Sequence, residues 1–271
     1  KLKIPVVTGW NAHDLISNDN RYYSGKPGTV GDRPGNFTVQ NSDLLIVLGC
    51  RLNIRQISYS WKGFAPKAFK IMVDLDQAEL DKPTLKIDYK IKADLKKFIP
   101  LFLKKIESLN YATTKEHNKY LKWCKEKVIE YPVVLPEYTN KKNKKINPYV
   151  FIDNLFDLLN KNDVVITGNG SACVISFQAA KIKQGQRLYT NSGSASMGYD
   201  LPASIGAAIA LKGKRVICLA GDGSLMMNLQ ELQTMKGYKL PIKVFVLNND
   251  GYVSIKQTQE TYFSDNISGV G

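Results

Sequence analysis

Two short apolar runs, separated by a stretch with helical spacing, constrain the fold of this chain more than any other feature. Residues 216–220 and 242–247 each have the length and composition of a buried strand. Between them, leucine and methionine recur at the spacing of a helix that begins at Ser224. A strand, a helix and a second strand form a right-handed unit with parallel strands. The sequence therefore predicts an α/β fold built on a parallel sheet.

Polar residues follow both of these strands. The first strand leads into the turn Gly221-Asp222-Gly223-Ser224, and Asn249 follows the second strand, 27 residues after Asp222. The carboxyl ends of neighbouring parallel strands are where ligand crevices form, so Asp222 and Asn249 are predicted to offer oxygen ligands to Mg²⁺. Gly223 and Ser224 lie at the helix start, where free backbone N–H groups favour phosphate. The residues alone thus suggest a Mg²⁺-bridged diphosphate.

The GDG turn, followed at this spacing by Asn248-Asn249, resembles the thiamine-diphosphate motif. The surrounding residues are similar to those of the acetolactate synthase large-subunit family. The resemblance covers essentially the whole chain, which corresponds to about half of a family subunit. It implies an α/β protein with two doubly wound parallel-sheet domains, truncated at both ends. These are a Rossmann-like middle domain at residues 1–109, a linker at 110–147 and a thiamine-diphosphate-binding domain at 148–271, incomplete at its C-terminal end.

Apolar and glycine-rich segments fit this division. The segments SDLLIVLGCRL and IMVDLD match the pattern of the family's middle domain. In the first domain and the linker, strands are predicted at residues 4–8, 44–49, 69–74 and 86–89, and helices at 36–41, 93–109 and 115–130. In the second domain, further strands are predicted at 164–167 and 187–190, and helices at 149–159 and 199–211. Asn147-Pro148 fits an N-cap followed by proline at the first helical position.

The resemblance implies thiamine diphosphate and Mg²⁺ as cofactors. Asp222 and Asn249 would bind the metal through side-chain oxygens, and Gly251 would bind it through its backbone carbonyl. Gly223 and Ser224 would contact the diphosphate through N–H and hydroxyl donors.

Further residues complete the expected cofactor site. Asn169 and Gly170 follow the strand at 164–167 and would touch the same phosphates, with a plain turn as the alternative for Asn169. Gly221 and Tyr252 adjoin the metal residues and are assigned to the same site.

Residues 191–199 resemble the family's segment before a helix rich in small residues. Met197 aligns with the apolar residue that props the cofactor in a bent shape, although a methionine at a helix entry also fits ordinary core packing. The carbonyl of Ala195 and the N–H of Met197 would hold the pyrimidine edge. Family members often have glycine at the positions of Ala195 and Asp200, and no role for Asp200 emerges from the sequence.

Some family members bind FAD on the middle domain. The glycine-rich segment 25–35 with Arg33, and the turn Gly49-Cys50-Arg51, fall where such contacts would lie. Many relatives keep this fold without a flavin, and the interpretation without FAD is favoured.

No catalytic residue is assigned in this chain. In the family, the glutamate that activates the cofactor comes from an N-terminal pyrimidine-binding domain of a partner subunit. That domain would precede Lys1, and the start without methionine and the end at Gly271 indicate that both ends are cut. The chain alone is therefore expected to be inactive, and the intact protein is expected to be a homodimer or tetramer.

The default function is that of a carboligase of branched-chain amino acid biosynthesis, which converts two molecules of pyruvate to 2-acetolactate and CO₂. A second interpretation keeps thiamine diphosphate and changes the 2-oxo acid, or places the enzyme in surface-sugar biosynthesis. A third is a nucleotide- or phosphate-binding module without enzymatic activity, which the presence of both predicted metal-binding side chains argues against.

Composition excludes several other classes. The net charge is +14, but the lysines are spread along the chain without a nucleic-acid-binding module, so no nucleic-acid partner is expected. The four cysteines are far apart in sequence, which indicates reduced thiols and a cytoplasmic protein. No apolar segment is long enough to span a membrane, and no signal peptide is visible.

Overall fold

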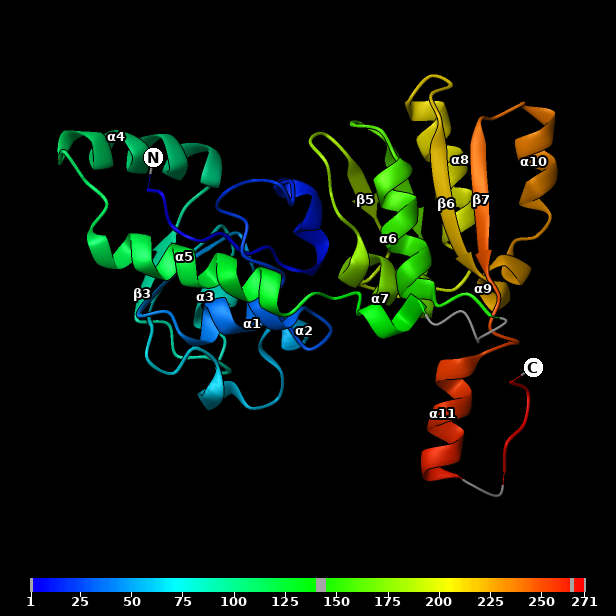
Figure 1. Ribbon diagram of the computed structural model, residues 1–271, viewed down its shortest axis with the longest axis horizontal. Coiled ribbons are helices and arrows are strands. Elements are labelled where there is room, and N and C mark those ends of the chain that lie inside the picture. Colours follow the sequence, from blue (N-terminus) through cyan, green and yellow to red (C-terminus); the bar gives the residue numbers. More distant parts are fainter. Residues whose placement is uncertain (1, 140–144, 264–265, 271) are drawn as a thin grey trace. The chain divides into compact units, whose positions relative to one another are not determined.

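The computed structural model describes residues 2–139, 145–263 and 266–270, which form two compact units. Unit 1 comprises residues 1–12 and 19–133, and unit 2 comprises residues 13–18 and 134–271. Each unit contains a parallel sheet, which confirms the predicted α/β class (Figure 1). The predicted domain limits stay a prediction, and residues 140–144 of the predicted linker lie outside the described residues.

Unit 1 has a three-stranded sheet in the order β1-β2-β3. The strands are β1 (Leu44–Leu48), β2 (Phe69–Asp74) and β3 (Tyr89–Lys92), and Val47 pairs with Met72 in the parallel register. The helices are α1 (Arg33–Gln40), α2 (Ile54–Ile57), α3 (Gln77–Asp81), α4 (Leu95–Ser108) and α5 (Lys115–Glu130), with a short 3-10 turn at Trp61–Gly63. A second 3-10 segment, Trp10–Leu15, begins in unit 1 and ends in unit 2. The helix α5 of the predicted linker packs against α1 and so belongs to this unit.

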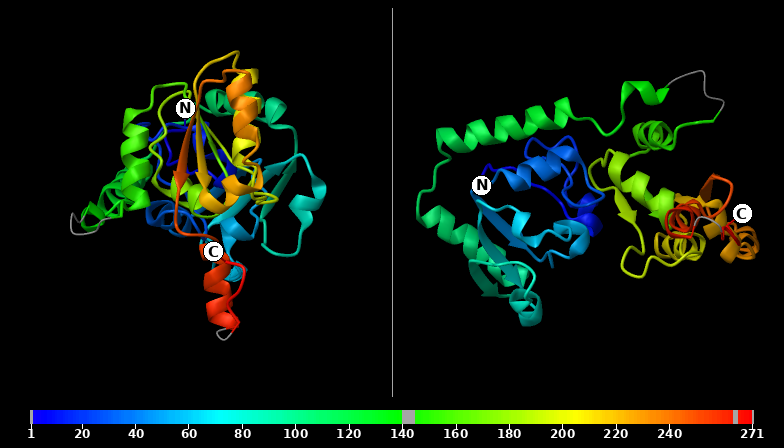
Figure 2. Two further views of the ribbon diagram at one scale, coloured as in Figure 1. Left: turned by 90° about the vertical axis from the view of Figure 1, so that its right-hand side faces the viewer. Right: turned by 90° about the horizontal axis from the view of Figure 1, so that it is seen from below.

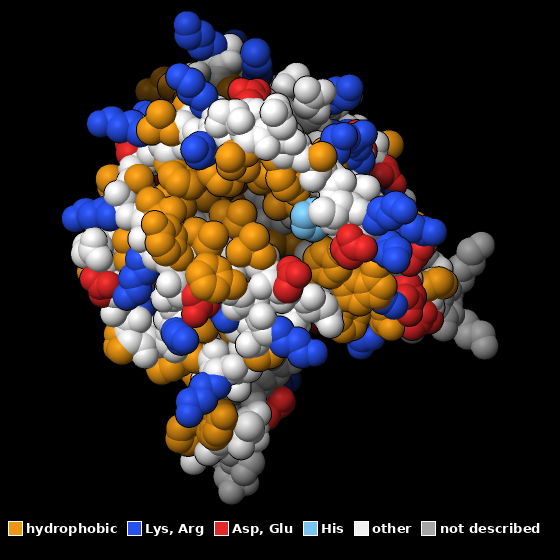
Figure 3. Space-filling view, turned by 90° about the vertical axis from the view of Figure 1, so that its left-hand side faces the viewer, with side chains coloured by type: hydrophobic (Ala, Val, Ile, Leu, Met, Phe, Trp, Pro, Cys, Tyr) orange, Lys and Arg blue, Asp and Glu red, His pale blue; other side chains and the backbone are white. Residues whose placement is uncertain are grey.

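The two faces of this sheet have different surroundings. Val47 and Met72 point into a core completed by residues of α1 and α3. Leu44, Phe69 and Tyr89 lie on the opposite face and are between 48% and 58% exposed. Figure 3 shows hydrophobic side chains gathered around a hollow on one side of unit 1. Parallel sheets are normally covered on both faces, and their strands are apolar on both faces. The strands of this sheet keep that apolar composition, although the face that carries Leu44, Phe69 and Tyr89 is partly exposed in this structure.

Two predicted strands of unit 1 require correction. Residues 4–8 do not form a strand, and only Val6 makes an isolated parallel bridge with Tyr23. Pro5 lacks the N–H that a sheet ladder needs. The strand predicted at 86–89 begins at Tyr89, because Asp88 uses its carboxylate to accept the N–H of Lys70 at 2.9 Å.

Unit 2 has a four-stranded parallel sheet in the order β5-β4-β6-β7. The strands are β4 (Val164–Thr167), β5 (Arg187–Tyr189), β6 (Val216–Gly221) and β7 (Ile242–Leu247). The helices are α6 (Pro148–Leu158), α7 (Gly170–Ala179), α8 (Asp200–Ala210), α9 (Asp222–Met227), α10 (Glu231–Gly237) and α11 (Val253–Tyr262), and Pro136–Thr139 forms a 3-10 turn. Asn147 caps α6 by accepting the N–H of Tyr149, as predicted.

The layers of unit 2 place its core on both sides of β6. The helix α6, which packs against α7, lies on one face of the sheet, and α8, which packs against α10, lies on the other (Figures 1 and 2). The strand residues 216–220 are at most 3% exposed. The small side chains of α8, such as Ala208, let it approach β4 and β6 closely. The single helix predicted from Ser224 is instead two helices, because Asn228 leaves helical geometry and donates its side-chain N–H to Gly198.

The contrast between the two faces of β2 gives a stability test. Met72 is 1% exposed and Phe69 is 50% exposed. We expect Met72→Ala to lower the free energy of unfolding by about 2–5 kcal/mol. Phe69→Ser, at the open face, is expected to change it by less than about 0.5 kcal/mol. Urea denaturation followed by circular dichroism measures both, and equal costs would show that the face carrying Phe69 is covered.

Candidate functional site

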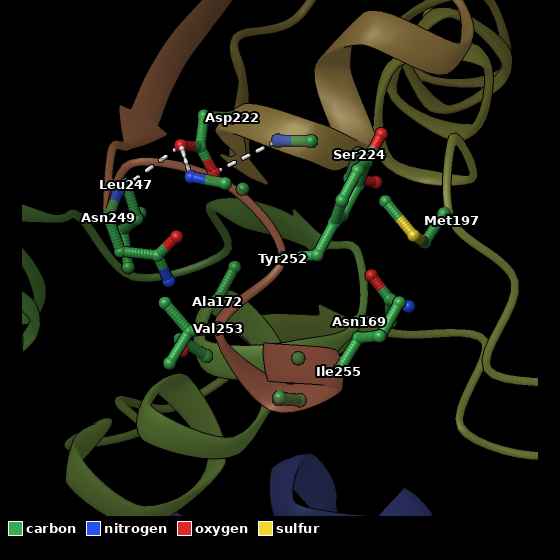
Figure 4. Close-up of a pocket in the computed structure, with 16 residues that line it drawn as sticks. Asn169, Ala172, Met197, Asp222, Ser224, Leu247, Asn249, Tyr252, Val253 and Ile255 are labelled. Atoms are coloured by element: carbon green, nitrogen blue, oxygen red, sulfur yellow. Dashed lines mark hydrogen bonds between the residues drawn. The ribbon is translucent and has the colours of Figure 1, made fainter. Parts of the chain in front are cut away.

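The sheet of unit 2 has its topological switch point between β4 and β6. The chain leaves β4 to build β5 on one side and then crosses back to build β6 on the other side. Ligands of open parallel sheets bind outside the carboxyl ends of the strands at this point. A pocket lies there, within unit 2 (Figure 4). Its lining is formed by residues 169–172, 197, 221–224, 247, 249 and 251–255.

Three helices begin at this pocket: α7 at Gly170, α9 at Asp222 and α11 at Val253. None of the three receives a hydrogen bond from the side chain of its N-cap residue, whereas Asn147 does cap α6. Helix N-termini carry partial positive charge and backbone N–H donors, which favour bound anions. The pocket is therefore suited to an anion such as a phosphate group.

The predicted metal residues converge at one corner of the pocket. The carboxylate of Asp222 accepts the N–H of Gly251 at 2.9 Å and that of Asn249 at 3.3 Å, both through Oδ2 (Figure 4). Its Oδ1 accepts the N–H of Gly223 at 2.9 Å. One carboxylate thereby holds the start of α9 and the turn after β7 together, although these segments are distant in sequence.

The spacing of oxygen atoms at this corner fits a small cation. One terminal atom of the Asn249 amide lies 2.8 Å from the carbonyl oxygen of Gly251 and 3.2 Å from Asp222 Oδ1. If that atom is nitrogen, the amide donates to both oxygens; if it is oxygen, three oxygens converge. Octahedral Mg²⁺ with oxygens at about 2.1 Å places neighbouring ligands about 3.0 Å apart. With oxygen in that position, the Asn249 amide lies at distances from the other two oxygens that match those between neighbouring Mg²⁺ ligands.

This corner differs from metal sites made of several charged or imidazole side chains. Among the described residues, no group of three or more His, Cys, Asp or Glu is placed to hold a metal. The donors here are one carboxylate, one amide and one backbone carbonyl, all hard oxygen ligands of the kind that Mg²⁺ prefers.

Gly223 has an identifiable packing reason to be glycine. A Cβ at this position would lie 2.4 Å from the ring of Tyr252 and 3.3 Å from the terminal methyl of Met197. Tyr252 and Met197 thus lie close to the start of α9 and contribute to the apolar part of the lining (Figure 4). At Gly221, by contrast, a Cβ would meet open space.

Other predicted cofactor residues lie at or beside the pocket. Asn169 and Gly170 line it, and the Asn169 side chain donates to the carbonyl of Ala195 at 3.0 Å. Ala195 is the one predicted residue that is absent from the lining, and its backbone has a left-handed conformation with φ of 53°. Its carbonyl, expected to face a pyrimidine, already accepts one hydrogen bond from Asn169.

The hydroxyl of Ser224 has a hydrogen-bond partner inside the protein, and its expected contact with the diphosphate stays a prediction. Ser224 is 3% exposed, and its hydroxyl donates to the carboxylate of Asp200 at 2.5 Å. A hydroxyl has a single proton to donate, so this one is not available to a phosphate while the bond to Asp200 is in place. Burial raises the pKa of Asp200, and the bond from Ser224 opposes that rise.

Several lining residues were not found from the sequence. They are Ser171 and Ala172 at the start of α7, Leu247 at the end of β7, and Val253, Ser254 and Ile255 at the start of α11. The available signal was positional, because residues that begin a helix directly after a strand-end motif face the same crevice as that motif.

The glycine-rich loop that was considered for FAD is packed on itself. A Cβ at Gly31 would lie 2.0 Å from the carbonyl oxygen of Lys26, and one at Gly35 would lie 2.4 Å from the Lys26 nitrogen. Asp32 accepts the N–H groups of Lys26 and Gly35 inside this loop. These glycines serve the loop's own packing, and FAD stays an untested alternative.

The cysteines offer little support for thiol chemistry. All four cysteines are free, and burial raises the pKa of Cys218 to about 12, which makes its thiol a poor nucleophile. Within the described ranges, no helix combines the length and apolar character that a membrane crossing requires.

Comparison with known proteins assigns both parts of the chain to one family. Residues 1–102 match the central domain of thiamine pyrophosphate enzymes, and residues 168–271 match their C-terminal TPP binding domain. The chain belongs to the thiamine pyrophosphate enzyme family. The resemblance predicted from the GDG and Asn248-Asn249 motifs is thereby confirmed, while the roles of individual site residues stay predictions.

Relatives of this thiamine pyrophosphate enzyme include acetolactate synthase large subunits. That of Cyanidium caldarium is 34% identical over 266 residues, which are 97% of this chain and 44% of that protein. Isozyme 1 of Escherichia coli (strain K12) is 29% identical over 270 residues, 98% of this chain and 45% of that protein. The probable acetolactate synthase large subunit of Methanococcus aeolicus is 30% identical over 271 residues, 97% of this chain and 45% of that protein. The chain thus spans less than half the length of these relatives.

The close contact above Gly223 can be tested by adding a methyl group. We expect Gly223→Ala to lower the free energy of unfolding by about 1–3 kcal/mol, because the Tyr252 ring must move. Gly221→Ala is the matched control, for which we expect a change below about 0.5 kcal/mol. Urea denaturation measures both.

Tyr252→Ala should remove most of the cost of Gly223→Ala. The double variant is then expected to depart from additivity by roughly 0.5–3 kcal/mol. Additive costs would show that Tyr252 does not fill the space above Gly223.

Proposed function

We propose that this chain belongs to a thiamine-diphosphate- and Mg²⁺-dependent 2-oxo acid decarboxylase or carboligase, with acetolactate synthesis from two pyruvates as the specific reaction. The observation that carries the proposal is the convergence of Asp222, Asn249 and Gly251 beside three uncapped helix starts. A cation corner next to an anion pocket is the arrangement that a metal-bridged diphosphate requires. The names of the relatives support the choice of reaction.

In this proposal, the polar part of the pocket anchors the cofactor. Asp222 and the Asn249 amide hold Mg²⁺ with side-chain oxygens, and Gly251 holds it with its carbonyl. The N-terminal ends of α7, α9 and α11 bind the diphosphate with backbone N–H groups and their helix dipoles. Besides Ser224, which donates to Asp200, the lining carries the hydroxyl groups of Ser171, Ser254 and Tyr252.

The apolar part of the pocket orients the rest of the cofactor. Met197 and Tyr252 meet over Gly223 and provide the surface against which its rings bend. When bound, thiamine diphosphate supplies a nucleophilic ring carbon and accepts the electrons left when CO₂ departs from a 2-oxo acid. Met197 and Tyr252 also exclude water from this side of the pocket.

The size of the pocket supports a site shared with another part of the assembly. Its volume is about 150 Å³, whereas ligand pockets commonly measure ~300–1,000 Å³. Met226 and Met227, on the same helix as Asp222, are 64% and 50% exposed. We therefore include a homodimer or tetramer in the proposal, in which a facing surface covers these side chains and completes the walls.

The metal assignment is tested by binding. We expect Asp222→Ala and Asn249→Ala to weaken Mg²⁺-dependent binding of thiamine diphosphate at least ~100-fold, because each removes a direct metal ligand. Asp250→Asn is the matched control: it is adjacent in sequence, its side chain is 70% exposed, and asparagine tolerates its φ of 64°. Isothermal titration calorimetry with and without EDTA measures these affinities. Unchanged binding by Asp222→Ala would exclude the metal assignment.

The reaction is tested on the whole protein with thiamine diphosphate, Mg²⁺ and pyruvate. We expect acetolactate, measured as acetoin after acid conversion, and its loss in Asp222→Ala. Acetaldehyde without acetolactate would replace the carboligase by a simple decarboxylase. Bound cofactor with neither product would exclude pyruvate as the substrate.

A further inference from the structure

A buried carboxylate lies beneath the candidate cofactor pocket. Asp200, the first residue of α8, is fully buried. Its Oδ1 accepts the N–H of Leu201 at 2.9 Å, and its Oδ2 accepts the hydroxyl of Ser224 at 2.5 Å. A Cβ at Gly168 would lie 2.2 Å from Oδ2, so only glycine at the end of β4 leaves room for this carboxylate. Asp200 therefore joins the ends of β4 and β6 to the start of α8.

Ser224 is also hydrogen-bonded to the segment that carries Met197. The N–H of Gly198 donates to the Ser224 hydroxyl oxygen at 2.8 Å. The carbonyl of Gly198 accepts the side-chain N–H of Asn228 at 2.7 Å. Both sides of the Gly198 residue are thus held by hydrogen bonds, and the next residue toward the N-terminus is Met197.

The direction of these hydrogen bonds shows that Asp200 orients the Ser224 hydroxyl, and through it the N–H of Gly198. The Ser224 hydroxyl has one proton, which Asp200 accepts, and its lone pairs then face the Gly198 N–H. Without the carboxylate, the hydroxyl is free to rotate and donate elsewhere, and Gly198 loses an oriented acceptor. Position 198 requires glycine, because its φ is 78° and a Cβ would lie 2.6 Å from Asn228 Nδ2.

We propose that Asp200 is a positioning residue that fixes Met197 against the cofactor through Ser224 and Gly198. This inference rests on the proposed function. Asp200 is not itself a lining residue; it contacts the lining only through Ser224 and acts on the wall that would face the cofactor's rings. It explains why a charged residue occupies a fully buried position, and why the hydroxyl of Ser224 points away from the phosphate site.

Comparing the binding of two ligands distinguishes this positioning role from a general contribution to the stability of the pocket. Inorganic pyrophosphate with Mg²⁺ occupies only the anion and metal region, whereas thiamine diphosphate with Mg²⁺ also contacts Met197. We expect Asp200→Ala to weaken thiamine diphosphate binding by at least ~10-fold and pyrophosphate binding by less than ~2-fold. Without Asp200, the segment that carries Met197 must be ordered when the cofactor binds, and this costs affinity only for a ligand that contacts Met197. Isothermal titration calorimetry on the whole protein measures both.

Three further variants keep the proposal falsifiable if Asp200→Ala folds poorly. Ser224→Ala breaks the same link from the other side and should show the same split between the two ligands. Met197→Ala should also show it, and should add little to Ser224→Ala. Asp200→Asn keeps one oxygen that can accept from Ser224 but places its amide nitrogen against the N–H of Leu201, so it should restore part of the thiamine diphosphate affinity.

The outcomes separate this inference from the proposed function. Equal weakening of both ligands, or unchanged binding of both by Asp200→Ala and Ser224→Ala, would overturn the positioning role. An Asp200→Asn variant as weak as Asp200→Ala would do the same. Failure of the unaltered protein to bind either ligand would instead overturn the proposed function.

Discussion

Parallel pairing of β6 with β7 is the constraint on which the candidate site depends. The register places Gly221 opposite Leu247, so the turns after both strands leave the sheet at one edge. Asp222 then needs only its own side chain to reach the backbone of Asn249 and Gly251. Because residues 216–220 of β6 are buried, a shift of this register would expose core side chains. The same burial that stabilises the unit therefore also fixes the distance between the groups proposed to bind the metal.

The site combines two kinds of support that act on different parts of a ligand. At the surface of the pocket, Asp222 organises backbone N–H groups from two separate segments. One layer below, Asp200 and Ser224 connect the strand ends to Gly198. The first arrangement positions charged and polar groups at the pocket, and the second holds the apolar wall that contains Met197. One short helix, α9, takes part in both, because it carries Asp222 at its first position and the buried Ser224 two residues later.

The sequence predicted those parts of the fold that depend on local pattern. Apolar runs identified β4, β6 and β7, and the spacing of Asp222 and Asn249 placed them together. The prediction was wrong where one residue or a distant contact decided the conformation: Pro5 prevents the first strand, and Asn228 divides the helix after β6 by donating to Gly198. Asp200 could not be interpreted, because its partner Ser224 is close only after α8 and β6 have packed.

The uncapped starts of α7, α9 and α11 link ligand occupancy to the energetics of folding. Elsewhere in the chain, side chains such as Asn147 satisfy the first N–H groups of a helix; at the pocket no N-cap side chain does so, and a bound anion is the proposed partner. A ligand that binds only the folded state stabilises it in proportion to the logarithm of its free concentration. Under the proposed function, the supply of cofactor would therefore control the local unfolding of the first helical turns at this edge of the sheet, and their exposure to proteases.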